Sequence, residues 1–215
     1  MKKSSCFREF LKYSSLNVLG MIALSCYILA DTFFVSKALG ANGLTALNLA
    51  IPVYNFINGS GLMIGMGGGT KYAIFKSQGR MKEASHAFTN AAALTALIAA
   101  CFFLLGLFAS APIARMLGAD DNVFGMSRTY LQVLLLFAPM FMTNNLMLCF
   151  IRNDGAPQLS MAAMITGSLS NVVLDYVFMF PLGMGIFGAV LATGLAPVIS
   201  ILVQSSYLLT KKNQF

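Results

Sequence analysis

Residues 158–181 read QLSMAAMITGSLSNVVLDYVFMFP, an apolar run that contains Asp175 and, one helical turn before it, Asn171. A second run at 13–36, YSSLNVLGMIALSCYILADTFFVS, is uncharged until Asp31 near its end. A charge at the centre of a bilayer costs about 2.5–3.5 kcal/mol on insertion scales. Intramembrane carboxylates usually mark ion or proton pathways. The two runs therefore predict a membrane protein that uses these acids in transport.

The composition agrees with a membrane protein. The chain is 58% hydrophobic and 10% charged, with a mean hydropathy of +0.77, whereas soluble domains carry about 25% charged residues. Its net charge of +7 does not indicate nucleic acid, because the basic residues flank the apolar runs as loop residues do. The cysteines form no C-x-x-C pair, so we expect no disulfide and no metal site built on thiolates.

Six apolar runs are long enough to cross about 30 Å of hydrocarbon at about 1.5 Å per residue. They are 13–36, 44–70, 84–111, 123–150, 158–181 and 186–210. No linker or low-complexity segment divides them, so we expect a single membrane unit over residues 1–215. The predicted fold class is an all-α membrane protein, a bundle of six transmembrane helices.

Glycine and proline add local predictions. Gly61-x-x-x-Gly65 is a small-x-x-x-small pattern that lets two helices approach closely. Pro52, Pro139 and Pro197 fall inside three of the runs, where proline removes a hydrogen bond and interrupts or kinks a helix.

The positions of lysine and arginine predict the orientation. With the N-terminus in the cytoplasm, the outer segments hold only Lys37, Arg115 and Arg128. The inner segments then hold the other eleven basic residues: Lys2, Lys3, Arg8, Lys12, Lys71, Lys76, Arg80, Lys82, Arg152, Lys211 and Lys212. This bias predicts a multi-pass plasma-membrane protein with both termini in the cytoplasm.

Depth in the membrane then groups four polar residues. Asp31 and Asp175 each lie about six residues, or roughly 9 Å, from the outer end of a run, and Thr193 lies about 10–12 Å deep. Asn171 shares a helix face with Asp175, because residues four apart stack along a helix. We therefore expect Asp31, Asn171, Asp175 and Thr193 to form one polar layer in the outer half of the membrane.

This layer suits a small cation. Hard cations prefer oxygen ligands, so the four residues are candidate ligands for a sodium ion, the one metal we consider. Two nearby carboxylates in a low dielectric also share a proton readily, so sodium and proton coupling both stay open. The alternative is structural: Asp175 caps a local polar network and Asp31 marks a helix end at the interface.

Other polar side chains, together with the polarizable side chains of methionine and phenylalanine, indicate a substrate cavity. Asn48, Asn55, Asn144 and Asn145 are candidates to line it, although Asn144 and Asn145 have bonding to neighbouring helices as an alternative. A membrane-embedded enzyme is not expected, because no run contains a nucleophile with a base or a cluster of metal ligands. No organic cofactor is implied.

Several motifs together resemble the multidrug and toxic compound extrusion (MATE) family. Asp31-Thr-Phe-Phe-Val35 followed by Leu39-Gly-Ala41 is similar to the end of the family's first helix. The other similar segments are Ala46-Leu-Asn-Leu-Ala-Ile-Pro52, the glycine-rich Gly61–Gly69, Arg152-Asn-Asp-Gly155, Asn171-x-x-x-Asp175 and Gly185-Ile-Phe-Gly-Ala189. The ordered set covers nearly the whole chain.

The resemblance implies a cation-coupled antiporter, driven by sodium or protons, that exports organic and often cationic drugs across a bacterial plasma membrane. It also implies that Asp31, Asn171, Asp175 and Thr193 form the cation site of the amino-terminal lobe. Family members have twelve helices in two lobes, so we expect this chain to be an amino-terminal fragment whose partner is a missing C-terminal lobe. A flippase for lipid-linked cell-envelope precursors is the alternative function, and a basic central cavity would favour it.

Overall fold

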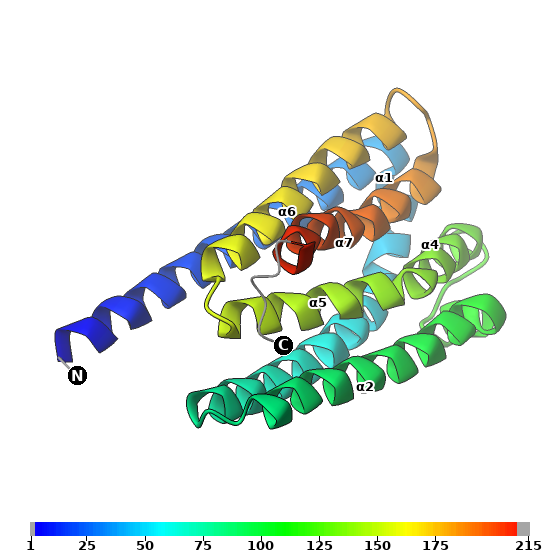
Figure 1. The fold of residues 1–215 in the computed structure, drawn as a ribbon. Helices are drawn as coiled ribbons and strands as arrows, with labels where there is room; N and C mark the ends of the chain where they lie inside the picture. The colour runs from blue at the N-terminus through cyan, green and yellow to red at the C-terminus, as the bar shows by residue number, and fades with distance from the viewer. Residues whose placement is uncertain (1–2, 210–215) are drawn as a thin grey trace.

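The computed structural model describes residues Lys3–Leu209, and within them every regular element is a helix (Figure 1). In chain order the helices are α1 (Lys3–Ser77), α2 (Met81–Phe108), α3 (Ser110–Met116), α4 (Phe124–Leu136), α5 (Ala138–Asn153), α6 (Pro157–Met179) and α7 (Gly185–Leu209). Lys2, Lys211 and Lys212 of the predicted inner side, and Thr210 at the end of the last predicted run, lie outside these residues.

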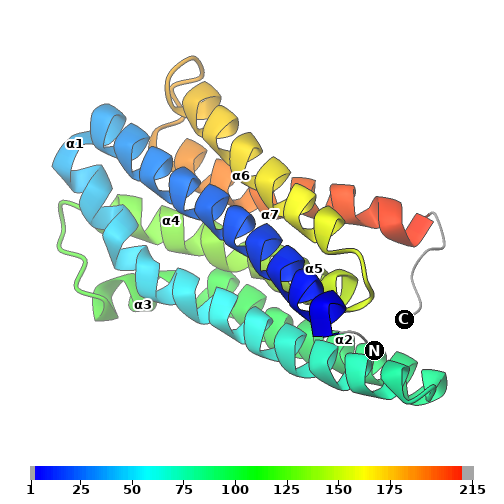
Figure 2. The ribbon, with the colours of Figure 1, turned by 90° about the vertical axis from the view of Figure 1, so that its left-hand side faces the viewer.

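Helix α1 consists of two limbs joined at Gly40. Gly40 has φ 64° and ψ −153°, a backbone conformation that glycine adopts without the steric cost a Cβ would bring. The chain reverses direction there, so the limb after Gly40 returns along the bundle in roughly the opposite direction to the limb before it (Figure 2). The two limbs contain the predicted runs 13–36 and 44–70, so α1 represents two membrane crossings.

The predicted run 123–150 is a bent pair of helices. Helices α4 and α5 meet at Phe137 with a 46° bend, and Pro139 stands in the first turn of α5, where its missing N–H breaks no helical bond. Pro52 and Pro197 lie inside α1 and α7, which continue past them, so Pro139 is the one of the three that coincides with a helix boundary. Proline in such a helix still leaves the carbonyl four residues earlier without its helical donor.

The helices are long and apolar enough for a multi-pass membrane protein. Four described helices qualify as spans by length and hydropathy, and the bent pair α4–α5 makes a fifth. Division of α1 at Gly40 brings the count of crossings to six, as the sequence predicts. The predicted run 84–111 corresponds to α2 with the start of α3, and the last two runs correspond to α6 and α7.

Glycines bring the second limb of α1 against α5. A Cβ added at Gly61 would lie 3.0 Å from the Met142 Cα, and one added at Gly65 would lie 3.1 Å from the Asn145 carbonyl oxygen. A side chain at either position would push these backbone atoms away by a few tenths of an ångström, so glycine allows the closest approach of the two helices. The close helix approach predicted from Gly61-x-x-x-Gly65 is therefore confirmed, and α5 is the partner.

The two ends of the bundle differ in their elements. One end, here called the basic end, holds the start of α1, the α1–α2 turn, the α5–α6 turn and the end of α7 (Figures 1 and 2). The opposite end holds Gly40, α3 and the α6–α7 turn. The membrane interior lies between them, and the predicted polar layer lies nearer the opposite end.

Candidate cation site and adjoining cavity

All four residues of the predicted polar layer are buried. Asp31 on α1 is 7% exposed, Asn171 and Asp175 on α6 are each 0% exposed, and Thr193 on α7 is 5% exposed. The first limb of α1 packs along α6, where Gly20 approaches Met164, and α6 packs against α7. The three helices therefore bring these residues into one region of the core.

Hydrogen bonds join three of the four. With its amide nitrogen turned toward Asp175, Asn171 donates to Asp175 Oδ2 at 3.0 Å and accepts from the Thr193 backbone N–H at 3.2 Å. The Thr193 hydroxyl donates to the Ala189 carbonyl at 3.1 Å. Pro197, four residues after Thr193, has no N–H for the Thr193 carbonyl, so this oxygen has no helical donor there.

The two carboxylates each have an oxygen that lacks a donor. Asp31 Oδ1 and Asp175 Oδ1 are buried and have no hydrogen-bond partner among the described residues. Asp31 lies close enough to Asp175 to interact with it electrostatically, and within Lys3–Leu209 neither acid forms an ion pair. A buried acceptor without a partner costs about 1–3 kcal/mol, and more when it is charged. A proton or a small cation would satisfy both oxygens.

Three tyrosines that sequence reasoning missed surround the acids. The Tyr27 and Tyr54 hydroxyls are hydrogen-bonded at 2.5 Å, and both rings lie within electrostatic range of Asp31. Tyr130 on α4 lies beside Thr193 and within range of Asp31 and Asp175. Only Tyr27 carries a sequence signal, since it precedes Asp31 by four residues on one helix face.

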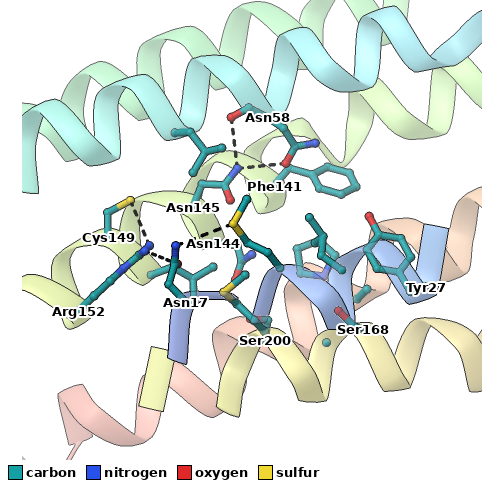
Figure 3. Close-up of a pocket in the computed structure, with 18 of the residues that line it drawn as sticks. Asn17, Tyr27, Asn58, Phe141, Asn144, Asn145, Cys149, Arg152, Ser168 and Ser200 are labelled. Atoms are coloured by element: carbon teal, nitrogen blue, oxygen red, sulfur yellow. Dashed lines mark hydrogen bonds between the residues drawn. The ribbon is translucent and has the colours of Figure 1, made fainter. Parts of the chain in front are cut away.

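A large cavity of about 630 Å³ lies among both limbs of α1, α5, α6 and α7 (Figure 3). This volume is within the range of about 300–1,000 Å³ that holds drug-sized ligands. Three of the predicted cavity residues, Asn55, Asn144 and Asn145, line it. Asn48 does not: it is exposed on the second limb of α1, about two helical turns closer to Gly40 than Asn55.

Neighbouring side chains hold two of the cavity asparagines. The Asn145 amide donates to Asn58 Oδ1 at 3.1 Å (Figure 3), and Gln204 donates to Asn144 Oδ1 at 2.7 Å. The expected bonding to neighbouring helices and the expected cavity position therefore both hold for these residues. These hydrogen bonds fix the two asparagine side chains as polar parts of the cavity wall.

A smaller cavity of about 120 Å³ lies against Asp31 and Tyr130. Tyr27, Tyr54, Asn55 and Thr193 line both the smaller and the larger cavity. Asn171 and Asp175 line neither. The acid layer therefore borders the large cavity through side chains that both spaces share.

Two charged residues at the basic end were not predicted as site residues. Arg152, which the sequence places in an inner segment between two runs, lies in the last turn of α5 and lines the large cavity. Asp154 follows α5 with a side chain that is 0% exposed. It pairs with Lys76 Nζ at 2.5 Å and accepts a hydrogen bond from Tyr207 at 2.8 Å, and Tyr72 donates to it as well.

The fold and site together define a class of multi-pass membrane protein: a helical bundle whose buried acids adjoin a drug-sized cavity. The sequence pattern of the MatE family matches residues 17–177. The chain therefore belongs to the MatE family, as the sequence motifs predict.

Curated relatives agree with this assignment. The chain is 27% identical to the multidrug export protein MepA of Staphylococcus saprophyticus over 214 residues, which are 99% of this chain and 47% of that protein. It is also 27% identical to MepA of Staphylococcus aureus, over 94% of this chain and 45% of that protein. The chain thus spans about half the length of these relatives.

Solved structures share the fold. The chain matches the outward-facing conformation of a multidrug resistance MATE family transporter with a TM-score of 0.88 at 28% identity, over 94% of this chain and 45% of that one. For the inward-facing conformation the TM-score is 0.80 at 28% identity, over 88% of this chain and 45% of that one.

Proposed function

We propose that the protein is a cation-coupled antiporter that exports small organic molecules across the plasma membrane of a bacterium. The observation that supports this most is the pair of buried oxygens, Asp31 Oδ1 and Asp175 Oδ1, that lack a donor in a layer beside a drug-sized cavity. In this proposal, sodium or a proton binds to the layer formed by Asp31, Asn171, Asp175 and Thr193. MepA, which this chain resembles, carries the name of a multidrug export protein.

The shared residues give the coupling a physical basis. Because Tyr27, Tyr54, Asn55 and Thr193 line both cavities, a cation that draws polar groups toward Asp31 changes the wall of the substrate cavity. Coupling between two ligands is reciprocal, so a cation that weakens substrate binding is itself bound more weakly when substrate is present. Substrate release would then accompany cation entry.

Alternating access needs two bodies that rock about a central site. The proposal therefore includes a second six-helix lobe that faces the large cavity. The basic end faces the cytoplasm in this proposal, because the excess of lysine and arginine lies on that side. The acid layer then lies toward the outside, where the driving cation enters.

The test is Asp175→Asn in the intact protein, expressed in a bacterial strain that lacks its own drug exporters. Everted vesicles report efflux of a fluorescent organic cation under a sodium gradient, a proton gradient, or neither. We expect the variant to insert normally but to lose cation-driven efflux, because the amide cannot take a proton and is a weaker sodium ligand.

The matched control is Asp121→Asn, which removes the same charge from a side chain that is 93% exposed. It should leave efflux unchanged. Normal cation-driven efflux by Asp175→Asn would refute the site, and comparison of the two gradients in the unmodified protein identifies the coupling ion.

A further inference from the structure

Helices α4 and α5 meet at Phe137, here called the joint, and one wall of the large cavity extends from it. The two helices bend by 46° there. The ladder of helical hydrogen bonds is interrupted at this point, because Pro139 has no N–H. Residues on one face of α5 line the cavity, among them Phe141, Asn145, Cys149 and Arg152 (Figure 3). A change in the bend would therefore move this whole wall.

The ring of Phe137 lies directly against Gly194 of α7. A Cβ added at Gly194 would lie 2.6 Å from Phe137 Cγ, and 2.8 and 2.9 Å from its two Cδ atoms. Phe137 Cγ is the fixed base of the ring, one bond from the Phe137 Cβ. It can move aside only if the rotamer or the backbone of the joint changes. A displacement of Gly194 toward α4 would therefore reach the joint directly.

The residue before Gly194 belongs to the acid layer. Thr193 is buried, and its backbone N–H donates at 3.2 Å to Asn171, which in turn donates to Asp175 Oδ2 at 3.0 Å. Tyr130 of α4 lies beside Thr193, about two helical turns before the joint. Helices α4 and α7 thus meet at the acid layer and again at the joint.

The turn of α7 that begins at Thr193 lacks part of its helical hydrogen bonding. Pro197 has no N–H for the Thr193 carbonyl, and the Thr193 N–H is directed to Asn171 on α6. The backbone of this turn can therefore shift more easily than that of a regular helix. A cation held by the acid layer would act on it, since Thr193 is one of the candidate ligands.

We propose that Phe137 and Gly194 are positioning residues that carry the response to cation binding from the acid layer to the cavity wall on α5. When α7 moves at Thr193, Gly194 displaces the Phe137 ring and the joint changes its bend. This inference rests on the proposed function, because it requires the layer to bind the driving cation. It adds a route through the helices to the route through the side chains that both cavities share.

Hydrogen exchange of the intact protein in lipid nanodiscs measures movement at the joint without any substrate. Mass spectrometry follows peptides within residues 133–145, in sodium against choline and at two pH values after correction for intrinsic rates. Exchange follows the local opening equilibrium, and coupling between sites is typically about 5- to 150-fold. Cation binding should therefore change exchange at the joint by at least about fivefold, and Asp175→Asn should abolish this change.

Matched variants separate the contact from general stability. Gly194→Ala should reduce the response, because its Cβ forces the Phe137 ring away. Gly188→Ala also adds a Cβ to α7, 3.0 Å from the Cβ atoms of Met184 and Phe178, but about 9 Å along the helix from Gly194. It should leave the response unchanged.

Phe137→Leu removes the ring without adding a clash, and it should also weaken the response. The double variant Gly194→Ala with Phe137→Leu fills the contact from the other side. It should therefore restore part of the response that each single change removes.

Three results would overturn the proposal. The first is an unmodified protein in which peptides of the acid layer respond to the cation but those of the joint do not, a comparison that needs no variant to fold. The second is a full response in both Gly194→Ala and Phe137→Leu. The third is a double variant that responds no better than either single variant. Normal cation-driven efflux by Asp175→Asn would instead refute the proposed function, whereas an unresponsive joint in a protein with coupled efflux refutes only this link.

Discussion

Replacement of Asp154 by asparagine should destabilise the bundle strongly, because its carboxylate joins three parts of the chain. The group is 0% exposed and is paired at 2.5 Å with Lys76, which is 26% exposed. It also accepts hydrogen bonds from Tyr72 on α1 and Tyr207 on α7. Asp154→Asn keeps the shape and one acceptor oxygen but removes the charge that compensates the Lys76 ammonium.

The expected loss can be estimated from the burial of the pair. Removing one partner of a fully buried ion pair costs about 3–5 kcal/mol. Lys76 is partly exposed and can turn toward water, so we expect about 2–4 kcal/mol here. At about 2–4 °C per kcal/mol for a chain of this size, Tm should fall by about 5–15 °C.

The chain supplies its own control. The Arg115–Asp121 pair has a similar distance of 2.7 Å, but its carboxylate side chain is 93% exposed, and exposed pairs contribute about 0–1 kcal/mol. Asp121→Asn should therefore barely change Tm. Thermal unfolding of the purified protein in detergent, followed by the accessibility of Cys149, measures both variants.

A double variant tests the cause. Lys76→Met combined with Asp154→Asn removes both charges, and such replacements are often far less costly than breaking the pair. The double variant should be more stable than the sum of the two single changes predicts. Equal Tm shifts for Asp154→Asn and Asp121→Asn, or strictly additive shifts in the double variant, would refute this account of the cluster.

Two further predictions use the same unfolding assay. Gly65→Ala and Gly67→Ala change helix propensity equally, but a Cβ at Gly65 meets atoms of α5, whereas one at Gly67 meets nothing within 4 Å. The Gly65→Ala variant should therefore be less stable than the Gly67→Ala variant by about 1–3 kcal/mol. Equal stability of the two variants would show that the interface between α1 and α5 is loosely packed. Gly40→Ala places a Cβ at φ 64° and ψ −153°, a region that only glycine adopts readily, and should cost about 1–3 kcal/mol. An unchanged Tm would show that the limbs of α1 do not depend on this conformation.

The crossings were predictable because hydropathy decides them. Runs such as 158–181 are long, apolar and bounded by turn residues, and α6 corresponds to it closely. The bend at Phe137 was not predictable from hydropathy, because the residues on both sides of it, 133–142, are all apolar. The effect of each proline was also not predictable from the sequence: Pro139 accompanies the bend and Pro52 does not. The reason is that packing against neighbouring helices decides which carbonyls can remain without a donor.

The grouping of the polar layer was predictable, because depth along a helix follows from residue spacing. Asp31, Asp175 and Thr193 are all buried, although their binding of a cation stays a prediction. Whether a side chain reaches a cavity does not follow from spacing alone: Asn48 shares a helix face with Asn55, which lines the cavity, but Asn48 does not. Arg152 was missed because its position near a turn does not indicate that its side chain lines the cavity.

The wall between the two cavities has a mechanical consequence. Tyr27, Tyr54, Asn55 and Thr193 border both spaces, so when one of these side chains swings toward Asp31, the larger space expands at the expense of the smaller. The smaller space is only about 120 Å³, room for a few water molecules. Rotation of one tyrosine ring therefore changes the volume of the smaller cavity by a large fraction and that of the larger cavity by a small fraction. An occupant of the smaller cavity opposes this rotation.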